Sequence, residues 1–177
     1  MAIAVYAWFD LECENIVRSI WKSLDLENIN STLNQGNYRP HITLSLTENL
    51  QIDNFAEALS KELNLSPPLA FSFSNCGIFL NTPPVAFLEV KKTSEIQALQ
   101  RSVHSLVLKF GTAPNSYYLP VEWRPHCTIA QTVFHSKFPL LYDFMRKIPL
   151  PIQGTIERIG IIETPIEKEL KQISFIN

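Results

Sequence analysis

The chain has 177 residues, of which 46% are hydrophobic and 18% are charged, so it is long and apolar enough for one globular domain with a substantial core. Its formal net charge of −2 excludes broad electrostatic binding to long duplex nucleic acid, which depends on many Lys and Arg side chains. The cysteines Cys13, Cys76 and Cys127 are odd in number and lack a C-x-x-C spacing, so we expect reduced thiols in a cytoplasmic protein.

The first half of the chain predicts an alternation of strands and helices. Its N-terminus is an apolar run without a basic leader, which indicates a first strand and not a signal peptide. Helices are expected where apolar residues recur every three or four positions, and strands where they alternate. In order, we expect a strand over 2–9, a helix over 12–26 capped by Asp10, a strand over about 39–47, a helix that Asp53 caps and Pro67–Pro68 ends, and a strand over 69–80.

The second half predicts the same order again. It comprises a strand over 85–90, a helix that the capping-box sequence 94–97 opens and Gly111 ends, a loop over 112–122, a strand over 123–132, a short helix around 138–147, and strands over 152–163 and about 171–176. We therefore expect one bilobal α+β domain over 1–177, with pseudo-repeats at about 2–80 and 84–177. Two antiparallel-rich sheets would line a central groove, with helices packed outside. No apolar run is long enough to cross a bilayer, so no membrane partner is expected.

Two heptapeptides, one in each half, share a pattern. Residues 38–44 read YRPHITL and residues 123–129 read WRPHCTI. Successive side chains of a strand point to opposite faces, so His41 and Thr43 share one face, and His126 and Thr128 do so in the second copy. The intervening apolar residues would face the core. A folding role explains the proline and the aliphatic positions, but not a histidine and a hydroxyl on the exposed face of both copies.

Paired histidines without a third ligand favour acid–base chemistry over a metal site, because catalytic zinc needs three protein ligands. One imidazole can accept a proton while the other donates one, on opposite sides of a phosphorus atom. Thr43 and Thr128 can hydrogen-bond the non-bridging oxygens. Arg39 and Arg124, on the same side by parity, are candidate phosphate ligands. We expect no metal and no cofactor.

Other residues near the motifs are given lesser roles. Tyr117 and Tyr118, in the loop before the second motif, are candidate stacking or lid residues. By strand parity Cys127 points toward the core, as an inert thiol rather than a nucleophile. Tyr38 and Trp123 are expected to pack at the strand entrances. We expect His104 and His135 to be solvated and outside the site.

The paired H-x-T-x segments at 41–44 and 126–129 resemble the signatures of the two-histidine phosphoesterase superfamily, which includes the 2′-5′ RNA ligase-like proteins and the RNA 2′,3′-cyclic phosphodiesterases. The resemblance extends over most of the chain. It implies a bilobal fold whose two histidine strands line a cleft, and metal-independent cleavage of a 2′,3′-cyclic phosphate or related phosphodiester. It also implies that His41 and His126 are the acid–base pair and that Thr43 and Thr128 bind phosphate.

Alternatives of two kinds stay open. Within the same chemistry, a 2′-hydroxyl could be the nucleophile, which gives 2′-5′ RNA ligase or exonuclease activity. From a different class, the chain could be a non-catalytic module that binds a nucleotide or an RNA end, or a structural protein with a relic duplication. The modest charge favours a small nucleotide or an RNA end as the partner over a long duplex, and a monomer is expected. Which histidine is the base cannot be read from a symmetric pair.

Overall fold

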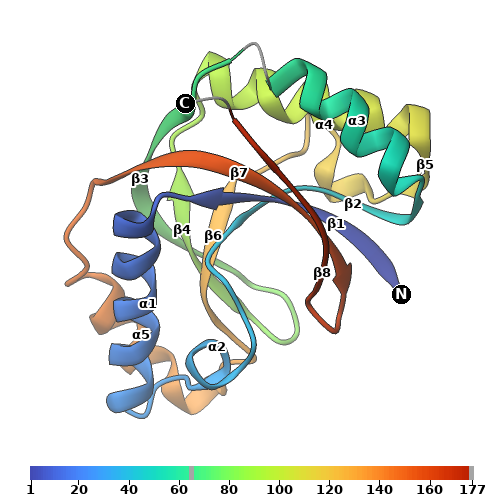
Figure 1. The fold of residues 1–177 in the computed structure, drawn as a ribbon. Coiled ribbons are helices and arrows are strands. Elements are labelled where there is room, and N and C mark those ends of the chain that lie inside the picture. The colour runs from blue at the N-terminus through green and yellow to red at the C-terminus, as the bar shows by residue number, and fades with distance from the viewer. Residues whose placement is uncertain (64–65, 176–177) are drawn as a thin grey trace.

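The computed structural model describes residues 1–63 and 66–175, which form helices around a long antiparallel sheet (Figure 1). The strands are β1 (Ala2–Phe9), β2 (Ile42–Leu50), β3 (Leu69–Phe79), β4 (Val85–Val90), β5 (Gly111–Pro114), β6 (His126–Gln131), β7 (Ile152–Thr164) and β8 (Lys168–Ser174). The α-helices are α1 (Leu11–Leu26), α2 (Thr32–Gln35), α3 (Ile52–Leu63), α4 (Ser94–Phe110) and α5 (Phe138–Met145). Two 3₁₀ turns cover Ser116–Tyr118 and His135–Lys137.

Most of the expected elements are confirmed, and so are two helix-end signals. The Asp10 carboxylate accepts a hydrogen bond from the Cys13 amide at 2.8 Å at the start of α1, and α4 ends at Gly111. Two predicted caps are wrong: Asp53 lies inside the first turn of α3 rather than capping it, and the capping box of α4 is displaced by one residue. The N-cap of α4 is Thr93, whose hydroxyl accepts from the Ile96 amide at 3.3 Å.

Other departures lie in the connections and at one helical histidine. The polar loops expected in each half contain α2 and β5, and β8 begins earlier than expected; position 176 of the predicted last strand lies outside the described residues. His104 is buried, not solvated, because it lies on the covered side of α4. None of the helices in the described ranges is long and apolar enough to span a membrane.

The α+β class, the antiparallel pairing and the outer helices are confirmed, but the two expected sheets are hydrogen-bonded into one. Its strand order is β5-β2-β1-β7-β3-β4-β6, with β8 also paired to β7. We call β5, β2, β1, β7 and β8 the first lobe, and β3, β4 and β6 the second lobe. The lobes join where the first part of β7 pairs with β3.

The strand order has an internal symmetry that sequence alone does not reveal. Between β2 and β6 the strand order is β2-β1-β7-β3-β4-β6. Exchanging β1 with β4, β2 with β6 and β3 with β7 turns this order into its own reverse. Strand β3 of the first half therefore lies in the second lobe, and strand β7 of the second half lies in the first lobe. This order supports the proposed duplication, whose boundaries remain a prediction.

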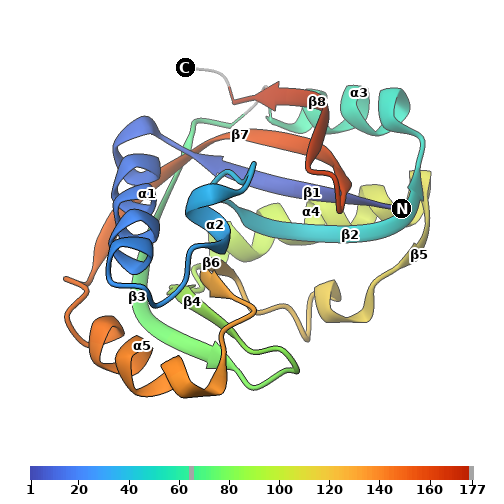
Figure 2. The same ribbon diagram turned by 90° about the horizontal axis from the view of Figure 1, so that it is seen from below.

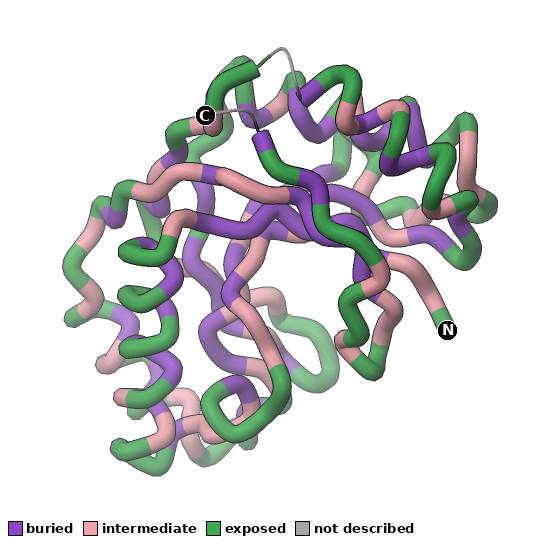
Figure 3. Tube along the Cα trace, in the orientation of Figure 1, coloured by how far each residue is buried: buried purple, intermediate pink, exposed green. Residues whose placement is uncertain are grey.

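The helices follow the same exchange. Helix α1 of the first half packs on β6, while α4 of the second half packs on β2. Figure 2 shows α1 and α5 at one end of the molecule and α3 and α4 at the other. Between the helices and the sheet lies one continuous apolar core, which Figure 3 shows as buried segments along the central strands. The opposite sheet face of the first lobe carries only a small cluster, formed by Ala4, Tyr6, Trp8 and Ile162.

Candidate functional site

The two heptapeptides lead into β2 and β6, which contact each other. Both strands begin about three residues later than expected, so His41 lies immediately before β2 and His126 is the first residue of β6. In the first copy Ile42 and Leu44 are each 1% exposed and belong to the core. His41 and Thr43, on the other face, are half-buried. The second copy follows the same alternation, with Cys127 and Ile129 buried and His126 and Thr128 half-buried. The face predicted for each of these side chains by strand parity is thus confirmed.

A β-bulge follows the motif threonine in both copies. On β1 and β2, Tyr6 lies opposite Thr43 and Val5 opposite Ser45, so Leu44 has no cross-strand partner. On β4 and β6, Phe87 lies opposite Thr128 and Ala86 opposite Ala130, so Ile129 is the extra residue. A bulge bends its strand and redirects side chains, and bulges are frequent next to active sites. Each motif therefore ends at the same local bend.

Both imidazoles are held through the same nitrogen. The Nδ1 of His41 lies 2.7 Å from the Arg39 carbonyl oxygen, and the Nδ1 of His126 lies 2.6 Å from that of Arg124. A carbonyl can only accept, so Nδ1 carries the hydrogen in each ring. The neutral imidazole then has its lone pair on Nε2. Each histidine can accept a proton at Nε2, or donate one from there after protonation.

Burial makes both imidazoles harder to protonate. It lowers the pKa of His41 from 6.5 to about 4; a charge on His126 also lowers it, while the hydrogen bond to Arg39 acts in the opposite direction. Burial likewise lowers the pKa of His126, again opposed by its backbone hydrogen bond. The two rings therefore interact electrostatically, and both are neutral near pH 7 in the free protein.

Aromatic side chains from neighbouring strands pack against each histidine. The Tyr6 ring stacks on His41, with 3.6 Å between ring centroids and 11° between ring planes. His126 meets Phe79 edge-on at 4.9 Å and Phe87 at a tilt at 5.3 Å. These contacts remove water from one side of each ring, which is the physical origin of the lowered pKa values.

Two adjoining cavities open beside the histidines. A cavity of about 130 Å³ is lined by His41 together with Tyr6, Trp21, Leu33, Tyr38, Arg39, Cys127, Thr128, Gln131 and Glu167. A cavity of about 680 Å³ is lined by His126 together with Phe79, Asn81, Val85, Ser116, Tyr117, Tyr118, Glu122, Arg124, Thr128 and Gln131. Thr128 and Gln131 line both, so the two form one cleft, with a histidine in each part. Thr43 lines neither cavity, and its side chain is hydrogen-bonded to the Tyr118 phenol.

The two predicted arginines have different surroundings. Arg39 is bound to Glu14, with 2.9 Å between Nη2 and Oε2, and its guanidinium lies 4.5 Å from the Trp8 ring centre. Arg124 is exposed, lines the larger cavity, and forms no ion pair within the described residues. Glu14 also pairs with Arg18 at 2.8 Å, so one carboxylate is shared by two guanidinium groups. Arg124 therefore offers the cleft an unpaired cation, while Arg39 is held by Glu14 at the edge of the His41 cavity.

The remaining predicted residues are distributed as follows. Tyr117 is 78% exposed and Tyr118 is half-buried, and both reach the larger cavity from the 3₁₀ turn before the second motif. Trp123 packs in the core, as expected at a strand entrance, but Tyr38 also reaches the cavity of His41. His135 is exposed and lines neither cavity.

Several cleft residues lie outside the motifs and were not predicted. The most direct is Tyr6, which strand alternation places on one face of residues 2–9 with Ala4 and Trp8. A phenol in an otherwise apolar strand was the available signal. Phe79, Phe87, Gln131 and Glu167 carried no comparable signal, because their approach to the histidines depends on strand pairing.

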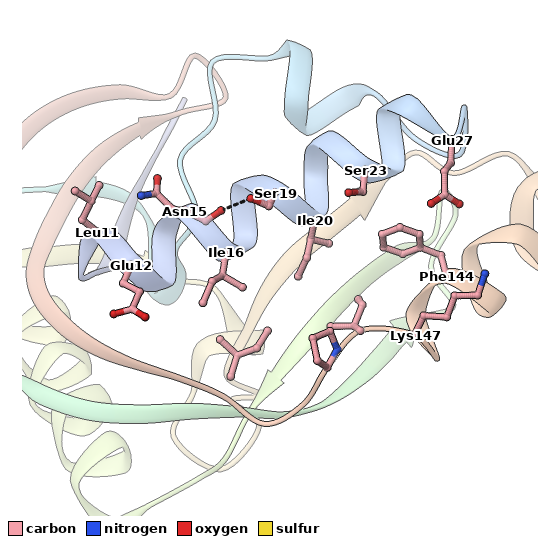
Figure 4. A pocket seen from close by; sticks show the side chains of 13 residues that line it. Leu11, Glu12, Asn15, Ile16, Ser19, Ile20, Ser23, Glu27, Phe144 and Lys147 are labelled. Atoms are coloured by element: carbon pink, nitrogen blue, oxygen red, sulfur yellow. Dashed lines mark hydrogen bonds between the residues drawn. The ribbon is translucent and has the colours of Figure 1, made fainter.

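A larger hollow lies elsewhere. A groove of about 900 Å³ runs along the outer side of α1, opposite Phe144, Lys147 and the start of β7 (Figure 4). No motif residue lines it, and it has no paired titratable groups comparable to the histidines. Within the described ranges there is also no group of three or more His, Cys, Asp or Glu side chains that could hold a metal ion.

Comparison with known proteins agrees with the geometry. The family model described as the 2′-5′ RNA ligase superfamily matches residues 16–165. No curated protein sequence matches the chain. Among solved structures, TT0787 of Thermus thermophilus has a TM-score of 0.64 at 14% identity, with 99% of this chain and 98% of that chain covered. E. coli LigT in the apo form has a TM-score of 0.60 at 13% identity, with 99% and 98% covered.

A further similar structure is Kluyveromyces marxianus Usb1 with uridine monophosphate, with a TM-score of 0.52 at 13% identity and 98% of each chain covered. At these identities the solved structures show a shared fold, while the family model matches most of the sequence. The chain belongs to the 2′-5′ RNA ligase superfamily of two-histidine phosphoesterases.

Proposed function

We propose that this chain is a metal-independent phosphodiesterase that opens a 2′,3′-cyclic phosphate, or a related phosphodiester, at the end of a nucleotide or an RNA. In this proposal water attacks phosphorus while one histidine takes its proton at Nε2. The bond to one ribose oxygen breaks, and that oxygen takes a proton from Nε2 of the other histidine. Thr128, which lines both cavities, hydrogen-bonds the phosphate oxygens, and Thr43 does so once its side chain turns from the Tyr118 phenol.

The observation that carries the proposal is the matched tethering of the two rings. His41 and His126 each donate Nδ1–H to the carbonyl two residues earlier, which leaves Nε2 as the reactive nitrogen in both copies. Their two cavities adjoin at Thr128. In-line displacement needs one proton acceptor and one donor on opposite sides of phosphorus, and in this proposal His41 and His126 fill these two roles.

The low pKa values fit such a cycle. A neutral imidazole is ready to act as the base. Its partner must become protonated to act as the acid, and a bound phosphate would raise the pKa of either ring through its negative charge. Arg124 lines the larger cavity and forms no ion pair within the described residues, so we assign it to the phosphate or to the next nucleotide. Tyr117 and Tyr118 are proposed to stack on a base.

The substrate is proposed to be a small nucleotide or an RNA end bound by a monomer. E. coli LigT has been solved with 3′-AMP and with ATP, and K. marxianus Usb1 with uridine monophosphate. The cavity beside His126, at about 680 Å³, lies within the range of about 300–1,000 Å³ typical of small-molecule sites. The net charge of −2 offers little for a long duplex.

The direct test is to incubate the protein with nucleoside 2′,3′-cyclic phosphates and with a cyclic-ended oligoribonucleotide, with and without EDTA. Chromatography of the products reports turnover and regiochemistry. Turnover that withstands EDTA, follows a bell-shaped pH profile and is lost in His41→Ala and in His126→Ala supports the proposal. His135→Ala is the matched control, because this histidine is exposed and outside the cleft.

Three outcomes would contradict the proposal. Turnover that survives His41→Ala or His126→Ala would show that the replaced histidine is not one of an acid–base pair. Tight nucleotide binding without turnover would indicate the binding module instead. Products joined through a new 2′-5′ linkage would place the chain with the ligases.

A further inference from the structure

The His41 ring is restrained from two directions. Its Nδ1–H bond to the Arg39 carbonyl, at 2.7 Å, fixes rotation of the imidazole in its own plane. The Tyr6 ring covers one face almost in parallel, at 3.6 Å and 11°. Any swing of the imidazole toward that side would collide with the phenol ring. Only Nε2 remains available to a ligand.

The Tyr6 ring is itself tied to a distant segment. Its hydroxyl donates to Glu167 Oε1 at 3.3 Å, and Glu167 lies in the turn of the β7–β8 hairpin (Figures 1 and 2). Glu167 has φ of 54°, in the left-handed region that non-glycine residues seldom adopt. Tyr6, Glu167 and His41 all line the smaller cavity.

The second copy of the motif provides an internal comparison. Phe87 lies opposite Thr128, just as Tyr6 lies opposite Thr43. Phe87 has no hydroxyl, and its ring meets His126 at a 59° tilt and 5.3 Å. The parallel stack and the hydroxyl contact are therefore features of the His41 side alone. Packing a histidine at this position needs only an aromatic ring, so the hydroxyl of Tyr6 serves another purpose.

We propose that Tyr6 is a positioning residue for His41, and that Glu167 fixes Tyr6 in place from the β7–β8 hairpin. This inference rests on the proposed function, in which His41 transfers a proton at Nε2. The stack sets the direction of Nε2, and the carboxylate prevents the phenol ring from sliding along β1. Since a displacement of about 1 Å can cost on the order of 10²-fold in rate, loss of the stack should reduce kcat.

The experiment separates the ring from its hydroxyl. Tyr6→Phe keeps the ring and removes the hydroxyl, whereas Tyr6→Leu removes the ring. Glu167→Gln keeps an acceptor for the hydroxyl, and Glu167→Ala removes it. We would measure kcat and KM with a nucleoside 2′,3′-cyclic phosphate, the midpoint of thermal unfolding, and the NMR shifts of the His41 ring protons, assigned by comparison with His41→Gln.

For Tyr6→Leu we expect a kcat lowered about 10- to 100-fold with KM little changed, and a His41 ring-proton signal shifted by loss of the stacked ring. The His126 signals should stay in place. Tyr6→Phe, which keeps the ring but loses the contact with Glu167, should retain most of kcat and of the His41 shift. Glu167→Ala breaks the same contact, so it should lower kcat to the same small extent as Tyr6→Phe, and more than Glu167→Gln does. This pattern would not arise from general destabilisation, which would move both histidines.

An unchanged kcat and an unchanged His41 signal in Tyr6→Leu would overturn the inference and leave the proposed function standing. Tyr6→Phe as impaired as Tyr6→Leu would also overturn it, because the ring would not be the positioning element. Absence of turnover in the wild-type protein would overturn both, since there would be no proton transfer for Tyr6 to assist.

Discussion

The Trp123 indole of the second motif donates its Nε1 hydrogen to the Thr43 carbonyl of the first motif, at 2.9 Å. A matching bond runs the other way, from the Trp21 indole of α1 to the Thr128 carbonyl at 3.1 Å. Both indoles are nearly fully buried. In each half of the chain, a tryptophan therefore donates a hydrogen bond to the strand that carries the motif threonine of the other half.

Trp123→Phe should lower the free energy of unfolding by about 1–3 kcal/mol, because it leaves the Thr43 carbonyl without its donor and removes buried volume. Urea denaturation measures this loss, and turnover of a cyclic nucleotide should fall as well. Trp21→Phe is the matched variant on the other side. Wild-type stability in both variants would show that the indole hydrogen bonds do not brace the strands.

Stability should fall as the pH is lowered, because of His41. Its folded-state pKa of about 4 lies below the usual 6.5, so the unfolded chain binds a proton more readily than the folded protein. This contribution to stability is fully present above about pH 6.5, is lost as the pH falls toward 4, and amounts to on the order of 2–3 kcal/mol. Urea denaturation from pH 4 to 7.5 measures it. His41→Gln should reduce the slope over that window, with the part due to His126 remaining, and an unchanged slope would contradict the lowered pKa of His41.

Cys127→Ala should leave turnover within about threefold of wild type and cost about 1 kcal/mol of stability, because its thiol belongs to the core. Cys127 is 1% exposed, and burial raises the pKa of its thiol to about 12. Iodoacetamide should not inactivate the folded protein. Near-complete loss of turnover in a variant with the wild-type circular dichroism spectrum would make the thiol a reactive group.

The two motif arginines should respond differently to replacement. Arg124→Gln should raise KM about tenfold with little change in stability, since its guanidinium is exposed and free to meet a phosphate. Arg39→Gln removes a partner of the buried Glu14, so it should lower the unfolding midpoint instead. Steady-state kinetics and thermal melts on both variants distinguish these effects. The reverse pattern would show that Arg39 is the phosphate ligand.

The sequence predicts what depends on neighbouring residues. Alternation along each strand correctly separates His41 and Thr43 from the buried Ile42 and Leu44. Asp10 and Gly111 mark helix ends because capping is settled within a few residues. The burial of His104 was missed, since it depends on what covers that side of α4.

Strand partners are settled by tertiary packing, and there the sequence is silent. Nothing local indicates that β7 lies between β1 and β3, or that Tyr6 and Phe87 face the motif threonines. The approach of Glu167 to Tyr6 spans 161 positions of the chain. The motif residues could therefore be predicted, whereas the groups that hold them could not.

The exchange of β3 and β7 between the halves has a consequence for how the cleft can move. Neither half contains a complete lobe, so cutting the chain near Pro84 should release two fragments that fold only when mixed. The two histidine strands are connected through the paired strands β1, β7, β3 and β4, with one register shift in the β1–β7 pair and one in the β3–β4 pair. Because one sheet joins both sides, we expect the cleft to keep nearly the same width when a ligand enters.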